Sequence, residues 1–500
     1  MTHLLIRADG NSTIGTGHLM RCLALGQAWQ EAGGTVNFAV TKAPPALEKR
    51  LCQETMGVNQ LTELPGTPQD ARQTITLAQK LSAKWVVVDG YHFDGDFQWA
   101  LKQAGLRLLV VDDYGHAGHY YADMVLNQNI YAQPSLYPSH EPDTRLLLGP
   151  EYALLRREFW SWRGWRREIA PLARKVLVTL GGADPDNVTL KVIRALRQTK
   201  LEGLQAVVVV GSSNPHWETL RAAINGSQQS IRLERDVTDM PALMTWADLA
   251  ISAGGSTCWE LAFMGLPSLV LILADNQRRV AEGLDAAGVA FNLGRPANLS
   301  PATLANALHA LAHQAEQRTV SARRGQELID GCGAARVAQQ MRTCDLTFRP
   351  VQAEDCRLIW EWANDPSTRA NSFSSEPISW EAHLTWFKAK LADPQCRFYL
   401  VLAAGEPAGQ IRYQLEGEEA VVSVGLAPNQ RGRGYGSQII RLVSQQLLAN
   451  GVTRLIRAYV KPDNAASLGA FSKAGFVAQG VTEIQGSQAI PLVLRRETQP

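Results

Sequence analysis

The sequence lacks an apolar run long enough to cross a bilayer. Its most apolar stretch, residues 266–274, has about half of the ~20 residues that a membrane-spanning helix needs. Residues 1–9 read as a first strand and have neither the basic start nor the cleavage pattern of a signal peptide. We therefore expect a cytoplasmic protein with no membrane partner.

An excess of one charge and clustered cysteines are also missing. The net charge is only +2, which argues against nucleic acid as a partner. The seven cysteines are scattered without a Cys-x-x-Cys pair, so they favour a reduced compartment over a disulfide framework or a zinc cluster. What is present is a globular composition, 45% hydrophobic and 19% charged. A chain of 500 residues has room for about three domains.

Up to about residue 330, short apolar runs alternate with amphipathic helical patterns. Residues 85–88 and 206–210 are apolar on both faces, as buried parallel strands are. The pattern predicts two doubly wound, Rossmann-like α/β lobes, residues 1–155 and 156–335, with ligands at the strand ends that face the gap. We expect strands at residues 4–9, 36–41, 85–89, 107–112, 175–180, 205–210, 249–252 and 268–273.

The alternation breaks at a basic, tryptophan-rich segment, residues 156–167. Such a segment can bind a membrane or a nucleic acid, but Pro171 closes this one and no matching basic surface accompanies it. We expect an interdomain helix whose tryptophans pack between the lobes. A second junction is expected near residues 331–346, where a helix at residues 334–342 follows Gly331 and Gly333. Few apolar residues there predict separable halves.

A glycine-rich turn follows a strand expected at residues 420–426. The turn, residues 431–436, precedes an apolar helical pattern, and Asn464, Ser467 and the pair Gly475-Phe476 come later in the chain. Glycine N–H groups at a helix N-terminus suit a diphosphate, and two arginines add positive charge. The bland alternative is a glycine-rich turn before an amphipathic helix.

These residues resemble the acetyl-CoA site of the GNAT-family N-acetyltransferases. The family pattern is Arg/Gln-x-x-Gly-x-Gly after a strand, then Asn-x-x-Ser and Gly-Phe. The resemblance implies a GNAT α/β domain over residues 345–500 with acetyl-CoA as co-substrate. The residues that it places on acetyl-CoA are Leu426, Arg431, Gly432, Arg433, Gly434, Gly436, Asn464 and Ser467.

One position departs from that family. Phe471 stands where many members have a tyrosine that gives a proton to the leaving thiolate. The module then uses another acid or water, or it only binds CoA without catalysing a reaction.

Another glycine-rich turn ends the first strand and leads to Gly17 and His18. The third glycine of a dinucleotide fingerprint is absent. His18 falls where the first helix begins. Because a helix N-terminus disfavours imidazolium, His18 can stay neutral and act as a base. The alternative is a histidine that caps the turn.

A further turn, residues 252–260, lies at a strand-to-helix junction in the second half. Its backbone N–H groups can hold a pyrophosphate, and Glu260 on the following helix can bind ribose hydroxyls. Asn276 and Gln277 follow the next strand, where their amides can pair with sugar hydroxyls. The arrangement resembles the UDP-sugar enzymes of the GT-B fold.

Several motifs between about residues 3 and 310 resemble one family more closely, the UDP-sugar hydrolase of the pseudaminic acid pathway (PseG type). They include Arg7-Ala8-Asp9-Gly10, Ile14-Gly15-x-Gly17-His18-x-x-Arg21, Val88-Asp89-Gly90-Tyr91 and Val111-Asp112-Asp113. The resemblance implies hydrolysis of UDP-2,4-diacetamido-2,4,6-trideoxy-β-L-altropyranose to UDP and the free sugar, with water attacking the anomeric carbon and no metal. It makes His18 the general base. The residues expected to bind the UDP-sugar are Gly17, Arg21, Gly254, Gly255, Ser256, Thr257, Glu260, Asn276 and Gln277.

The start of the third domain adds a second resemblance to that pathway. Residues 362–369 and the run His383-x-x-Trp386-Phe387 are similar to the acceptor half of the pathway's acetyltransferase, which acetylates a UDP-4-amino sugar. Simple packing of His383 and Trp386 on a helix, with the histidine at the rim and the tryptophan in the core, is the alternative. His116 and His119 could bind a metal by residue type, but their spacing matches no familiar ligand frame.

The sequence thus predicts a bifunctional enzyme that acts on small UDP-amino-sugar substrates. Two alternatives remain: a GT-B glycosyltransferase with an attached acetyltransferase for another nucleotide sugar, and a hydrolase with a non-catalytic GNAT module. The sequence leaves the sugar stereochemistry and the oligomeric state open.

Overall fold

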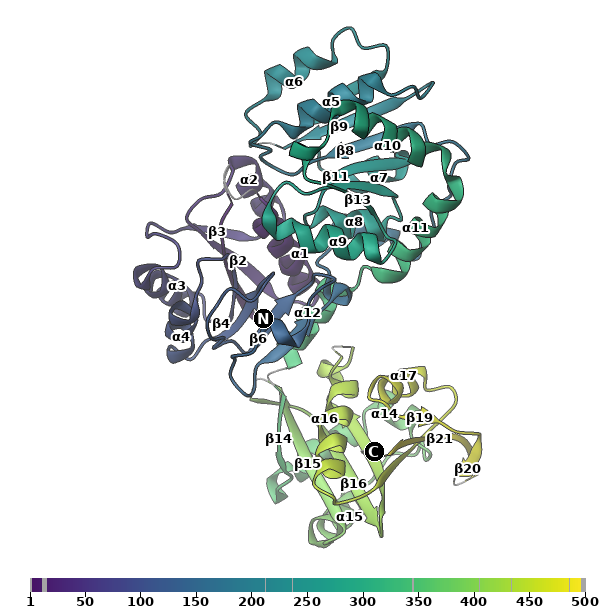
Figure 1. Cartoon of the computed structure of the whole chain (residues 1–500). Coiled ribbons are helices and arrows are strands. Elements are labelled where there is room, and N and C mark those ends of the chain that lie inside the picture. Colours follow the sequence, from purple (N-terminus) through teal and green to yellow (C-terminus); the bar gives the residue numbers. More distant parts are fainter. Residues whose placement is uncertain are drawn as a thin grey trace. The chain divides into compact units, whose positions relative to one another are not determined.

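The computed structural model describes residues 2–10, 16–211, 213–235, 237–343, 346–403, 405–432, 434–484 and 486–495. The chain divides into two compact units, Met1–Ala338 and Gln339–Pro500. The first unit holds two parallel sheets and the second holds one mixed sheet (Figure 1). Within the described residues, no helix is both long and apolar enough to span a bilayer.

The first sheet has seven parallel strands in the order β3-β2-β1-β4-β5-β6-β7. Its strands are β1 (His3–Ala8), β2 (Thr35–Val40), β3 (Gly57–Gln60), β4 (Ala83–Asp89), β5 (Arg107–Val111), β6 (Met124–Asn127) and β7 (Arg145–Leu148). The helices that go with them are α1 (Gly17–Glu31), α2 (Pro45–Gln53), α3 (Pro68–Lys80) and α4 (Gly95–Gln103). Leu5, Val86 and Val88 of this sheet share a buried cluster with Ala78 of α3 and Leu101 of α4.

The second sheet has six parallel strands in the order β10-β9-β8-β11-β12-β13. They are β8 (Lys175–Thr179), β9 (Gln205–Val210), β10 (Ser230–Arg235), β11 (Leu249–Ala253), β12 (Ser268–Leu271) and β13 (Phe291–Gly294). The helices are α5 (Val188–Gln198), α6 (Trp217–Ile224), α7 (Met240–Trp246), α8 (Thr257–Phe263), α9 (Arg278–Ala286), α10 (Pro301–His313) and α11 (Ala315–Leu328).

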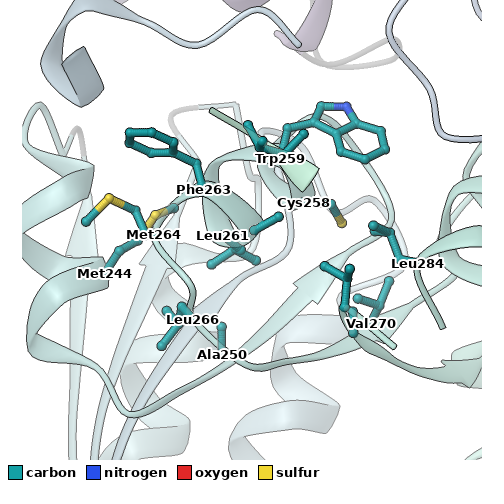
Figure 2. Packing of buried hydrophobic residues seen from close by; sticks show 14 of the residues in the cluster. Met244, Ala250, Cys258, Trp259, Leu261, Phe263, Met264, Leu266, Val270 and Leu284 are labelled. Atoms are coloured by element: carbon teal, nitrogen blue, oxygen red, sulfur yellow. The ribbon is translucent and has the colours of Figure 1, made fainter. Parts of the chain in front are cut away.

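Alternate side chains of the second sheet enter two different cores, as a doubly wound sheet requires. Leu177, Ala250 and Val270 join α7, α8 and α9 on one face. Val176, Ile251 and Leu269 join α5 and α10 on the other. Figure 2 shows the first core, in which the apolar side of α8 packs against the strands and fixes the turn that precedes this helix.

All eight expected strands are present, and the predicted pair of parallel α/β lobes is confirmed. The sequence reading missed five strands, β3, β6, β7, β10 and β13. Four of them have only four residues, too few for a periodicity to stand out. The fifth, β10, is a half-exposed edge strand with three charged residues, which hides its period.

The tryptophan-rich segment forms a short 3-10 helix, η3 (Arg157–Trp162), where a longer helix was expected. It does join the two lobes: the Arg157 N–H donates to Gln27 Oε1 of α1 at 2.7 Å, and Phe159 is fully buried in the core beside α8. Trp162 and Trp165 pack against that same core. Phe159 is therefore the residue of this segment that enters the core of the second lobe. Trp162 and Trp165 pack on the outside of that core and do not lie between the lobes as expected.

The second expected junction is a helix, α12 (Gly333–Thr343), with a buried apolar side. Ala334 is 2% exposed and Val337 is fully buried, so the expectation of few apolar residues to bury is wrong. Gly333 lies so close to Ala153 that an added Cβ would be 2.3 Å from the Ala153 carbonyl oxygen. A boundary at residue 335 therefore falls inside a packed helix.

The second unit contains one mixed sheet in the order β14-β15-β16-β17-β18-β21-β19, with β20 paired to β21. The strands are β14 (Leu346–Pro350), β15 (Cys396–Ala403), β16 (Glu406–Glu416), β17 (Glu419–Leu426), β18 (Leu455–Val460), β19 (Val477–Ala478), β20 (Thr482–Ile484) and β21 (Ser487–Arg495). The helices are α13 (Cys356–Ala363), α14 (Pro366–Asn371), α15 (Trp380–Ala392), α16 (Tyr435–Ala449) and α17 (Ala465–Lys473).

β17 and β18 are parallel neighbours that separate along their length. Their pairing covers only Glu419–Val421 of β17, whereas β17 pairs with β16 as far as Leu426. Beyond Val421, the side of β17 that faces away from β16 is therefore unpaired within the described strands. A strand edge of this kind offers free N–H and C=O groups to an extended, amide-containing ligand.

Candidate functional site

A cleft of about 380 Å³ separates the two parallel sheets of the first unit. Both lobes line it at the carboxyl ends of their strands, where ligands bind in open α/β sheets. The cleft brings together the predicted base His18 and every residue that the sequence placed on the UDP-sugar, namely Gly17, Arg21, Gly254, Gly255, Ser256, Thr257, Glu260, Asn276 and Gln277.

His18 is the second residue of α1 and is held by a buried carboxylate. Its Nδ1 lies 2.6 Å from Oδ1 of Asp89, the last residue of β4. His18 is 12% exposed, and Asp89 is completely buried. A carboxylate that accepts the Nδ1 proton leaves Nε2 as the acceptor, which is the state that a general base needs.

Asp89 stays ionised in this setting. Burial alone would raise its pKa, but the positive charge of Arg21 and the contact with His18 outweigh burial and hold the pKa well below its usual range. The helix N-terminus was the predicted reason for a neutral His18, and the sequence reading assigned no role to Asp89. The feature of the sequence that could have identified Asp89 is an acidic residue at the end of a buried strand.

Arg21 was expected to contact the substrate, but its guanidinium bridges two carboxylates of the first lobe. Nε and Nη2 donate to Asp89 at 2.6 and 2.7 Å, and Nη1 donates to Asp113 Oδ1 at 2.8 Å. Asp113 also accepts a hydrogen bond of 2.7 Å from the Tyr91 hydroxyl. A continuous network therefore joins His18 to Tyr91, and Arg21 is its centre.

Tyr91 stands beside His18 and reaches the opposite lobe. The two rings are perpendicular with centroids 5.2 Å apart, and Asn276 Nδ2 donates to the Tyr91 hydroxyl at 3.1 Å. Burial and then the neighbouring Asp113 raise the pKa of Tyr91 far above its usual value, so the phenol is neutral. Gln277, also expected on the sugar, accepts from the Leu273 N–H at 3.0 Å and so holds its own loop.

The turn between β11 and α8 presents backbone N–H groups, but they are not equivalent. The Gly254 N–H donates to the Leu271 carbonyl at 3.1 Å, so it is already used in the sheet. A Cβ at Gly254 would lie 3.0 Å from the Gln277 carbonyl oxygen, which explains the glycine by close packing. Among the described residues, the N–H groups of Gly255, Ser256 and Thr257 have no internal acceptor and suit a pyrophosphate.

Glu260 lies one turn further along α8 and is 14% exposed. Arg156 Nε and Nη2 both donate to its Oε1, at 3.1 and 2.8 Å. Burial raises the pKa of Glu260, and Arg156 opposes that shift without cancelling it. The sequence reading placed Arg156 only in a packing segment, and it missed this contact.

His116 and His119 contact different partners. His116 Nδ1 lies 2.7 Å from Asp112, whereas His119 contacts Ser139 at 2.8 Å and Glu141 at 3.0 Å. The two rings therefore do not converge on one point.

The glycine-rich turn of the second unit precedes α16 as predicted. Gly432 and Gly434 have φ values of 73° and 78°, so both positions require the left-handed conformation that glycine adopts easily. Gly436 lies inside α16, and an added Cβ would be 3.6 Å from Leu426, an ordinary contact. Arg433 lies outside the described residues.

The other predicted CoA contacts have internal partners in this structure. Arg431 donates to Asp365 Oδ1 at 2.6 Å and to Thr368 Oγ1 at 2.8 Å, at the start of α14. Asn464 caps α17, and its Oδ1 accepts from the Ser467 N–H at 3.1 Å. Leu426 ends β17, where the unpaired edge reaches the turn.

Phe471 and His383 are both buried. Phe471 is 4% exposed and packs perpendicular to Phe476, with ring centroids 5.1 Å apart. His383 is 2% exposed and lies among the aromatic rings of α15, whereas Trp386 is 36% exposed. The alternative of simple packing placed His383 at the rim and Trp386 in the core, and the structure shows the opposite. Burial lowers the pKa of His383, so the ring is neutral.

Comparison with known proteins identifies two domains in the chain. Residues 176–332 match the glycosyltransferase family 28 C-terminal domain, and residues 345–477 match the acetyltransferase (GNAT) domain. The solved structure of MurG from Acinetobacter baumannii aligns with a TM-score of 0.50 and 18% identity, covering 69% of this chain and all of that chain. The predicted fold class, two GT-B lobes followed by a GNAT domain, is confirmed.

Three curated relatives cover different shares of the chain. The UDP-2,4-diacetamido-2,4,6-trideoxy-β-L-altropyranose hydrolase of Campylobacter jejuni is 26% identical over 288 residues, 57% of this chain and 97% of that protein. The spore coat polysaccharide biosynthesis protein SpsG of Bacillus subtilis is 32% identical over 218 residues, 43% of this chain and 63% of its own length. An uncharacterised protein of Methanocaldococcus jannaschii is 22% identical over 398 residues, 77% of this chain and 78% of that protein. Homologues of a PseG-type hydrolase and a GNAT domain are thus fused in one chain.

Proposed function

We propose that the first unit hydrolyses UDP-2,4-diacetamido-2,4,6-trideoxy-β-L-altropyranose to UDP and the free sugar. The observation that carries this proposal is the His18–Asp89 pair, which lies in one cleft with a turn of free backbone N–H groups. The similarity to the Campylobacter jejuni hydrolase supports the choice of substrate.

In the proposed reaction, Nε2 of His18 takes a proton from a water molecule. The water oxygen forms a bond to the anomeric carbon, and the bond between that carbon and the UDP oxygen breaks. UDP leaves with the bonding electrons and is stabilised by the N–H groups of Gly255, Ser256 and Thr257. Asp89 is a positioning residue, because it holds the imidazole and does not face the substrate.

We propose that the second unit transfers the acetyl group of acetyl-CoA to the 4-amino group of the UDP-4-amino-sugar precursor. The GNAT match, the turn at Gly432 and Gly434 and the unpaired edge of β17 support acetyl-CoA as the co-substrate. The amine nitrogen forms a bond to the acetyl carbon and loses one proton to water, and the bond between that carbon and sulfur breaks as the CoA thiolate leaves. Phe471 has no hydroxyl, so water protonates the thiolate.

A second candidate for the first unit is glycosyl transfer, which the match to glycosyltransferase family 28 favours. A hydrolase releases UDP from its sugar without an acceptor, whereas a transferase requires an acceptor. Incubation of the full chain with the UDP-sugar in ¹⁸O-labelled water, followed by mass spectrometry, tests both. Label in the free sugar supports water attack at carbon; label in UDP, or no release without an acceptor, contradicts it.

A second candidate for the GNAT unit is CoA binding without catalysis. The missing hydroxyl at Phe471 favours it, because the usual proton donor to the leaving thiolate is then absent. The test supplies the UDP-4-amino sugar with acetyl-CoA and measures free thiol. Thiol release that requires the amino sugar supports acetyl transfer. CoA binding without thiol release supports the alternative.

A further inference from the structure

Glu260 is the inner end of a row of four alternating charges that begins on the other lobe. Arg50, on α2, donates from Nη2 to both oxygens of Glu158 at 3.0 Å. Oε1 of Glu158 lies 2.7 Å from Nη1 of Arg156, and Nη2 of Arg156 donates to Glu260 at 2.8 Å. The row therefore runs from a helix of the first sheet, through η3, to the wall of the cleft.

The members of this row are shielded from water. Their side chains are 19%, 16%, 6% and 14% exposed in that order. Opposite charges that are partly buried are screened by salt much less than exposed ones. A nearby pair between the lobes, Arg157 with Glu54 at 3.1 Å, is different because Arg157 is 42% exposed. Its side chain bonds to Glu54 and Gln30, and, among the described residues, to no member of the row.

The charge state of Glu260 responds to the row as a whole. Burial raises the pKa of this carboxyl, and Arg156 opposes the rise. Further along, Glu158 raises the same pKa and Arg50 lowers it. Loss of Arg50 should therefore raise the pKa of Glu260, and loss of Glu158 should lower it. Either loss breaks the same ion pair between the lobes.

We infer that Arg50 is a positioning residue that keeps Glu260 ionised for the ribose of a uridine nucleotide, and that Glu158 links Arg50 to Arg156 and opposes this ionisation. The inference rests on the proposed function, in which Glu260 accepts hydrogen bonds from two ribose hydroxyls. An ionised carboxylate has acceptor sites for both, whereas a protonated one turns one oxygen into a donor. Nucleotide affinity in one lobe then depends on a residue of the other lobe, and by linkage the bound nucleotide stabilises their contact.

Other ionisable groups near Glu260 are few and fixed. From its own helix, the Cys258 thiol is buried, and burial followed by Glu260 itself raises the pKa of that thiol to about 12. On the opposite wall, His18 and Arg21 are held by Asp89 and Asp113. Within the part of the chain that the structure describes, the remaining charges that act on Glu260 are Arg156, Glu158 and Arg50.

The test is UDP binding to the full chain by calorimetry, from about pH 5 to pH 8, since Glu260 titrates above its usual range. Affinity falls as the pH drops through the pKa of Glu260, because the acceptor is lost. Arg50→Gln should move this fall to higher pH and weaken binding roughly three- to tenfold on the acid side. Glu158→Gln should move the fall to lower pH.

Arg157→Gln is the matched control, because it removes an ion pair between the same lobes and leaves the row intact. Its pH dependence of UDP binding should equal that of the unchanged protein. Shifts of the same sign in Arg50→Gln and Glu158→Gln, or no shift, would overturn the inference while leaving UDP binding itself intact. A wild-type chain that fails to bind UDP at all would overturn the proposed function as well.

Discussion

Asp89 is buried beneath the residues that line the cleft and is contacted by three side chains. His18 and Arg21 contact its two oxygens, and the Cys22 thiol donates to Oδ2 at 3.4 Å. Residue-level reasoning from the sequence predicted His18 as a base, because a histidine at a helix start is visible in a motif. It could not find the pairing with Asp89, because 71 residues separate the two.

His18→Asn should reduce UDP release by ~10²–10⁴, because it removes the proton acceptor. Asp89→Asn should also lower kcat with little change in KM, since the imidazole loses its orientation but the UDP contacts remain. Steady-state assays of UDP release measure both effects. Cys22→Ala, which removes a weaker partner of Asp89, should cost far less, and equal losses in Asp89→Asn and Cys22→Ala would point to general disruption of the floor.

Phe471→Tyr places a hydroxyl in the core of the second unit, where Phe471 is 4% exposed. Without ligand it should lower the free energy of unfolding by ~1–3 kcal/mol, because a buried hydroxyl lacks a partner. It should raise the acetylation rate without changing acetyl-CoA affinity, since a proton donor acts on the transition state. Phe476→Tyr, at an equally buried neighbour, should carry the stability cost alone; equal rates in both variants would show that water suffices as the acid.

At the element scale, the turn before α16 and the turn before α8 illustrate what periodicity can predict. Both lie between a strand and a helix as the sequence predicted. Their individual glycines differ in purpose: Gly434 needs a positive φ, whereas Gly254 needs space beside Gln277. That difference depends on tertiary neighbours and on backbone angles, which a glycine in a sequence does not reveal.

Gly434→Ala should destabilise the second unit by ~1–2 kcal/mol, because a side chain is strained at a φ of 78°. Gly436→Ala should be neutral or stabilising by ~1 kcal/mol, because the residue is helical and the added Cβ meets only ordinary contacts. Thermal unfolding separates the two variants. If Gly436→Ala keeps its stability but binds acetyl-CoA more weakly in calorimetry, the glycine is needed for the close approach of the cofactor. A loss of stability in Gly436→Ala would contradict the helical conformation at this position.

At the scale of the whole molecule, the order of domains follows from the sequence but their junctions do not. The two parallel lobes were predicted from the alternation of apolar runs, and the third from its motifs. The junction at residues 331–346 was predicted to be separable because it has two glycines and few apolar residues, although a helix was expected there. Gly333 is there for close packing on Ala153, and Val337 is buried, which only the folded structure reveals.

A fragment of residues 1–343 should therefore be more stable than one of residues 1–335. The shorter fragment loses the buried Val337 and most of α12, and a buried valine alone contributes ~1.5–3 kcal/mol. Urea unfolding of both fragments, followed by tryptophan fluorescence, measures the difference. Equal midpoints would show that α12 adds nothing to the first unit.

The open edge of β17 has a consequence for the life of the protein in a cell. A strand whose N–H and C=O groups are unpaired is a template for adding another extended chain, which is how many aggregates begin. The proposed acetyl-CoA would cover this edge, and a ligand that binds only the folded state also stabilises it by mass action. The concentration of acetyl-CoA would then influence how long the enzyme survives as well as how fast it works.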